Sequence, residues 1–218
     1  MWDDAASSTL SSARWGEYQE AKVDGLRQLL PGVRFTANSL HWVTDCNLDL
    51  LRGSLDGGSF ENWLKNETWS QAMTQSQSAQ TANLPAIYWA RWNQGDVKVA
   101  KYKRFTYGSL LLTYRSTATR FQFGGPWGLN KPDKLMFWRF GAPTTNPSGV
   151  GALRVGTTPL YVRTFTHGRV VVNPSSSPRT YQVPAGHYDV IHLTSTGLPR
   201  LVSSVTIAAR DAAFLLKP

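Results

Sequence analysis

The stretch SLDGGSFEN, residues 54–62, decides the expected fold, because it is a strand-like segment that opens a run of alternating strands and helices. Its two adjacent glycines are typical of a strand whose backbone another group approaches closely. Outward from it, short apolar runs alternate with longer helical ones. The strand-like runs are 33–38, 54–62, 85–92 and 119–123, and the helix-like runs are 12–30, 63–83 and 97–117. This alternation predicts βαβ units and a parallel sheet.

The number of these units indicates how the sheet is arranged. If a further strand ends at Met1-Trp2, residues 1–145 hold five strands and their crossovers, which is about half of an eight-stranded barrel of about 250 residues. We therefore expect residues 1–145 to be part of a TIM-like (β/α)₈ barrel. A small open α/β sheet is the alternative.

The pattern changes after about residue 145 to short alternating runs with turn residues between them. The runs are 160–166, 168–173, 179–184 and 200–208. They predict a small antiparallel β-domain, a sandwich, over residues 150–218. His167-Gly168 separates the first two runs closely enough for a hairpin.

The composition is that of a folded chain with a hydrophobic core. Hydrophobic residues make up 41% of the 218 residues and charged residues 17%, below the roughly 25% usual for globular domains. The single cysteine, Cys46, excludes an internal disulfide and a cysteine-based zinc site, but leaves an extracellular or periplasmic location open. The four histidines lack ligand spacing, so no metal or organic cofactor is expected. No apolar run reaches the roughly 20 residues of a membrane span.

The charge is distributed unevenly along the chain. Residues 1–96 hold 7 basic and 11 acidic residues (net −4), whereas residues 97–218 hold 16 basic and 3 acidic (net +13). A basic half can bind nucleic acid. However, the basic residues are scattered apart from one cluster within 98–104, so a solvated face is the preferred interpretation and no nucleic-acid partner is expected.

Polar and aromatic residues gather at the expected carboxyl ends of the strands, where barrel enzymes place their chemistry. Asp3 or Asp4 and Glu61 supply two carboxyl groups, which is what acid-base cleavage of a glycosidic bond requires. Asn38 lies at a strand end between them. Side chains that could contact sugar are Trp2, Asn38, Trp42, Asn62, Trp63, Trp89 and Trp92. The alternatives are helix caps for the carboxylates, a turn for Asn38, and core positions for the tryptophans.

Several motifs together resemble a known family. They are similar to the C-terminal part of a glycoside hydrolase family, and they are WDD at a strand end, ANS (37–39), DGGSFENW (56–63) and the closing runs GRVVVNP (168–174) and RDAAFLL (210–216). The resemblance covers nearly the whole chain. It implies a (β/α)₈ barrel followed by a small β-domain, with MWDD as the end of the fourth barrel strand and the earlier strands missing.

The resemblance implies a glycosidase acting on a poly- or oligosaccharide, without a cofactor. Glu61 is the expected general acid/base, and Asp3 is the expected nucleophile or base, with Asp4 as its substitute because adjacent strand residues point to opposite faces. Asn38 could bind a sugar hydroxyl group. The alternative function is a carbohydrate-binding protein without catalysis.

Overall fold

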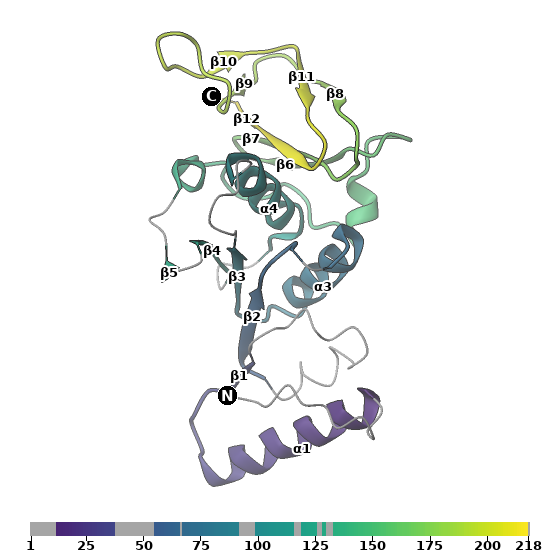
Figure 1. The fold of residues 1–218 in the computed structure, drawn as a ribbon, viewed down its shortest axis with the longest axis vertical. Coiled ribbons are helices and arrows are strands. Elements are labelled where there is room, and N and C mark those ends of the chain that lie inside the picture. The colour runs from purple at the N-terminus through teal and green to yellow at the C-terminus, as the bar shows by residue number, and fades with distance from the viewer. Residues whose placement is uncertain are drawn as a thin grey trace.

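The computed structural model describes residues 12–37, 55–65, 67–91, 99–115, 119–125, 128–129 and 133–217 (Figure 1). Its first half contains the helices α1 (Ser12–Leu29), α3 (Trp69–Thr81) and α4 (Val99–Thr113) and the strands β1 (Thr36–Ala37), β2 (Gly57–Glu61), β3 (Ala86–Arg91), β4 (Arg120–Gly125) and β5 (Gly128–Leu129). Its second half contains strands and two short 3₁₀ turns, η1 (Lys134–Phe137) and η2 (Val150–Leu153).

The first sheet is open and mixed. Strands β1, β2, β3 and β4 pair in parallel and in chain order, and β5 pairs antiparallel with β4. A TIM barrel needs eight parallel strands that close on themselves. The expected partial barrel is therefore wrong, because β5 turns back on β4 and ends the parallel run within a five-stranded sheet. The described sheet has the form of the alternative, a small open α/β sheet.

Helices α3 and α4 cover one face of this sheet. In β3, Ala86, Tyr88 and Ala90 are buried under the helices, whereas Ile87 on the other face is 46% exposed. Thr68 begins α3 with a capping box, because its hydroxyl accepts from the backbone of Gln71 and the Gln71 side chain accepts from the backbone of Thr68. In the part of the chain that the structure describes, the other face of β3 is the more open one.

The C-terminal part consists of antiparallel strands. These are β6 (Tyr161–Phe165), β7 (Gly168–Asn173), β8 (Arg179–Gln182), β9 (Tyr188–Asp189), β10 (Arg200–Leu201), β11 (Ser204–Ile207) and β12 (Asp211–Leu216). Five of them form a sheet in the order β10-β9-β12-β7-β6, and β11 and β8 form a separate ribbon. The hairpin expected at His167-Gly168 is present, since Phe165 pairs with Gly168.

The antiparallel five-stranded sheet, β10-β9-β12-β7-β6, is a middle layer of the molecule rather than half of a separate sandwich. One face packs on α4 and shares the main core through Val170, Val172 and Phe214. The other face packs on the β8-β11 ribbon in a second, smaller core. Figure 1 shows α4 between the parallel sheet and the antiparallel strands. Alternating burial predicts strands but not their partners, which is why the sequence did not reveal this layering.

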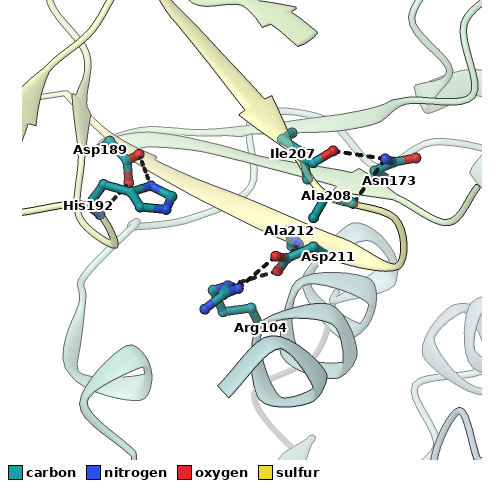
Figure 2. A network of polar contacts seen from close by, with 8 residues as sticks. All are labelled: Arg104, Asn173, Asp189, His192, Ile207, Ala208, Asp211 and Ala212. Atoms are coloured by element: carbon teal, nitrogen blue, oxygen red, sulfur yellow. Dashed lines mark hydrogen bonds and ion pairs between the residues drawn. The ribbon is translucent and has the colours of Figure 1, made fainter. Parts of the chain in front are cut away.

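Two residues of the motifs that carry the family resemblance have structural roles here (Figure 2). Asp211 of β12 forms a bidentate ion pair with Arg104 of α4, at 2.6 and 2.8 Å. Its neighbour in the ladder, Asn173, is fully buried. The Asn173 amide donates to the backbone carbonyls of Ser177, Ile207 and Ala208. These contacts join β12 to the helix layer and hold two turns together.

Substitution of Gly108 by alanine is expected to destabilise the protein, although alanine favours helix. A Cβ at Gly108 in α4 would lie 2.7 Å from the Cβ of Ala212 in β12. Overpacking of this kind costs about 1–3 kcal/mol. Gly25 is the matched control, because in α1 it has no heavy atom within 4 Å of such a Cβ. Gly25→Ala should instead stabilise the helix by up to about 1 kcal/mol. Urea denaturation of both variants measures the two effects, and equal midpoints would contradict the tight helix–sheet contact.

Candidate functional site

The candidate site lies at the carboxyl edge of the parallel strands. Strand β2 ends at Glu61 and β3 ends at Arg91, and Glu61 lies beside Trp89 in the ladder. Alternate residues of a strand point to opposite faces. Since Phe60 and Tyr88 stack on the helix side at 4.5 Å, the side chains of Glu61, Trp89 and Arg91 project from the open face.

Glu61 and Arg91 form an ion pair across the two strands. The Arg91 Nη1 donates to the Glu61 Oε1 at 2.7 Å. The side chain of Glu61 is 21% exposed and that of Arg91 is 31% exposed, so the pair is half-buried and still open to solvent. A charge-assisted bond of this length orients the carboxylate more strongly than a neutral hydrogen bond would.

Trp89 supports the ion pair from beside it. The Arg91 guanidinium lies over the indole at 4.6 Å from the ring centroid, in cation–π contact. Gly124 of β4 makes room for this indole, because a Cβ there would lie 2.0 Å from the Trp89 Nε1. Within the described part of the chain, this buried Nε1 has no hydrogen-bond partner. Gly124, Trp89, Arg91 and Glu61 therefore form one connected arrangement across three strands.

The opposite face of β3 is fixed by a buried polar network. The hydroxyl of Tyr88 accepts hydrogen bonds from Ser76 at 3.0 Å and from Gln80 at 3.4 Å, and Ser76 is also 2.6 Å from the Thr113 hydroxyl. Burial raises the pKa of Tyr88 to about 12, so this hydroxyl stays protonated at neutral pH. The network ties β3 to α3 and α4, and it gives the site on the other face a rigid base.

Trp63 and Asn62, two expected sugar-contacting residues that follow Glu61 in the sequence, have structural positions instead. Trp63 is fully buried, packs edge-to-face on Phe60 and Tyr88, and donates from its Nε1 to the Thr106 carbonyl at 3.1 Å. It is part of the core and offers no ring face to a ligand. Asn62 has a φ of 58° and lies in the turn that follows β2. Its carbonyl accepts from the backbone of Lys65.

The remaining expected site residues lie outside the described residues. They are Trp2, Asp3, Asp4, Asn38, Trp42 and Trp92. Glu61 and Trp89 are the expected site residues that the structure brings together.

Sequence reasoning missed Arg91 and Gly124. The alternation in AIYWAR (86–91) places Trp89 and Arg91 on one face of β3, so the signal for Arg91 was present in the spacing. Gly124 gave no such signal, because its role depends on the register between β3 and β4, which places it beside Arg91.

Two other aspartates with altered pKa serve the fold. The hydrogen bond from the Phe35 backbone, together with the Arg27 guanidinium 2.9 Å away, lowers the pKa of Asp56 and links α1 to the start of β2. Partial burial alone would raise the pKa of Asp133, but hydrogen bonds from Lys103 and the Leu135 backbone outweigh it and lower that pKa. Both carboxylates are held by structural partners.

No three histidine, cysteine, aspartate or glutamate side chains gather as a metal site in the described ranges. None of the helices that the structure describes is long and apolar enough to cross a membrane. No protein-family model matches the chain, and no curated protein is significantly similar to it.

Proposed function

We propose that the protein is a glycoside hydrolase in which Glu61 is one of the two carboxylates that cleave the glycosidic bond. The observation that carries the proposal is the orientation of Glu61 by Arg91, beside Trp89, on the open face and at the carboxyl edge of the parallel strands. Ligands of open α/β sheets bind at this edge. The sequence motifs that resemble a glycoside hydrolase family add support.

The contact with Arg91 favours a nucleophile or general base as the role of Glu61. The guanidinium donates to the Glu61 Oε1 and holds the carboxylate in one orientation, as a nucleophile or base requires, whereas a general acid needs a proton to give to the leaving oxygen. This reverses the roles expected from the sequence. The proposed second carboxylate is Asp3 or Asp4, and it would then protonate the leaving oxygen. Trp89 would hold Arg91 in place, because one face of its indole is occupied by the guanidinium.

A carbohydrate-binding protein without catalysis is the second candidate, and the same ion pair favours it. A carboxylate that Arg91 holds in one orientation can also bind sugar hydroxyl groups without taking part in bond cleavage. The hydrolase and the binding protein differ in whether glycosidic bonds of the ligand are cleaved.

An assay on the whole chain separates them. The chain is incubated with a panel of soluble polysaccharides and oligosaccharides, new reducing ends are measured between pH 3 and pH 9, and binding is measured by calorimetry. A hydrolase is expected to release reducing ends with a bell-shaped pH dependence set by two carboxyl groups. Binding without new reducing ends would leave the binding candidate, and neither binding nor hydrolysis would reject both.

Replacement of Arg91 by methionine is expected to lower kcat roughly 100-fold while KM changes little, because a misplaced catalytic group loses near-attack geometry. Arg91→Lys should recover part of the loss, since it keeps the charge but not the planar stacking on Trp89. Steady-state kinetics on one oligosaccharide measure both. Equal losses in the methionine and lysine variants would show that the positive charge does not act on Glu61.

A further inference from the structure

A polar groove lies among β9, β10 and β11, in the antiparallel part of the molecule. Its volume is about 320 Å³, and its walls are Asp189, His192 and the run 200–206. This volume is at the lower end of the range for small-molecule sites, about 300–1,000 Å³. In Figure 1, β2 lies on one side of α4, and β9, β10 and β11 lie on the other. The groove is therefore separate from the site of Glu61.

A buried carboxylate orients an exposed imidazole at this groove (Figure 2). The Asp189 Oδ1 accepts from the backbone N–H groups of Ile191 and His192, at 2.8 and 3.2 Å, and these two bonds close the turn. The Asp189 Oδ2 lies 2.7 Å from the His192 Nδ1. The Asp189 side chain is 3% exposed and that of His192 is 66% exposed. With Nδ1 as the donor, the Nε2 of His192 is an acceptor directed away from Asp189.

The third bond of Asp189 is not needed for the turn. It restricts an exposed side chain, which costs rotamer entropy, and it gives a further partner to a carboxylate that is only 3% exposed. Orientation of a ring nitrogen by a buried carboxylate is also what a ligand site requires. The Asp189–His192 pair therefore holds a ring nitrogen in a fixed position at the groove.

The other groups of the groove complement sugar hydroxyls. Arg200 lies beside Asp189 in the ladder and is exposed, and no residue in the described part of the chain pairs with its guanidinium. Ser203 and Ser204 also line the groove, and both are exposed. The groove holds the opposite charges of Arg200 and Asp189 side by side, which suits a neutral polar ligand.

We propose that this groove is a second carbohydrate site, which holds one or two sugar units of a neutral polysaccharide away from Glu61. The choice of ligand class rests on the proposed function. Hydroxyl groups of the sugar would form hydrogen bonds with the His192 Nε2 and accept from the Arg200 guanidinium.

Affinity electrophoresis of the whole chain in gels that contain laminarin, xylan or galactomannan tests this proposal. His192→Ala and Arg200→Ala should each raise the Kd for the bound polysaccharide by about tenfold or more, which is the loss expected for one hydrogen bond to a charged or oriented group. Arg179→Ala is the matched control, because it removes an exposed arginine outside the groove. This control should bind as the wild type does. Circular dichroism melting checks that each variant is folded.

Three results would overturn the groove proposal. These are wild-type affinity in both groove variants, absence of binding to every neutral polysaccharide, and an effect of the variants only on polygalacturonate, which would make the ligand an anion. The proposed function fails independently. Hydrolysis that is never detected while the groove variants lose affinity would reject the hydrolase and keep the groove. Hydrolysis by the wild type, together with unchanged polysaccharide affinity in the groove variants, would reject the groove proposal and keep the hydrolase.

Discussion

Replacement of Glu61 by glutamine is expected to lower hydrolysis of a good oligosaccharide substrate by about 10²–10⁴-fold, the range for loss of an acid, base or nucleophile. The amide carries no charge, so it can neither attack the anomeric carbon nor accept a proton from water, and it cannot act as an acid either. The fold should be kept, because the amide oxygen can still accept from the Arg91 Nη1. In the wild type, this nitrogen lies 2.7 Å from the Glu61 Oε1.

Glu17 provides the matched control for this variant. It is an exposed glutamate on α1, far in sequence from the parallel strands β2 to β4. Glu17→Gln removes the same charge and should leave hydrolysis at the wild-type rate. Thermal melts should coincide for both variants and the wild type. If Glu61→Gln turned over the substrate as fast as Glu17→Gln, Glu61 would have no catalytic role and the binding candidate would take precedence.

The local structure could be read from the sequence because it depends on residues that are near one another. The strands at 57–61, 86–91 and 120–125 lie within or overlap the segments that their apolar character and flanking turns predict. Glu61 at the end of β2 follows from the same reasoning. Both ends of α3 and the C-terminal end of α4 were less accurate, since the expected helices begin before Trp69 and continue past Thr81 and Thr113.

The barrel was wrong because βα alternation is a local property that open and closed sheets share. Closure depends on which strand the next one pairs with. Here Gly124 and Gly125 pair antiparallel with Leu129 and Gly128, and a two-residue strand such as β5 leaves almost no periodicity to read. The position of α4 between two sheets likewise depends on contacts between residues far apart, such as Arg104 with Asp211.

The site was only partly predictable for the same reason. A carboxylate at a strand end and a nearby tryptophan are visible in the sequence. That Arg91 pairs with Glu61, and that Trp63 turns into the core while Trp89 does not, depends on the register of three strands and on the face that the helices cover. Residues that pack across elements carry no local signal, and Arg163 is the clearest example.

Replacement of Arg163 by methionine is expected to destabilise the protein by about 3 kcal/mol, because it leaves several buried carbonyl groups without donors. Arg163 of β6 is fully buried. Its Nη1 donates to the Leu112 carbonyl at 2.6 Å, in the last turn of α4, and its Nη2 donates to the Thr145 carbonyl at 3.0 Å. Burial, and then the nearby charge of Arg115, lower the pKa of Arg163 to about 10, so the guanidinium is still charged at neutral pH. A cation at a helix C-terminus is favoured by the helix dipole.

Methionine keeps an unbranched apolar stem like that of arginine, so the change removes the donors while most of the stem packing is kept. Arg179→Met is the control, since Arg179 is exposed on β8. Arg163→Lys should recover part of the loss, because it keeps a charge near the Leu112 carbonyl but loses the planar fork that reaches two groups. Urea denaturation followed by tryptophan fluorescence measures all three midpoints. A midpoint for Arg163→Met equal to that of Arg179→Met would mean that the cost of burying this charge cancels the bonds it makes. The end of α4 would then be held to β6 by apolar packing alone.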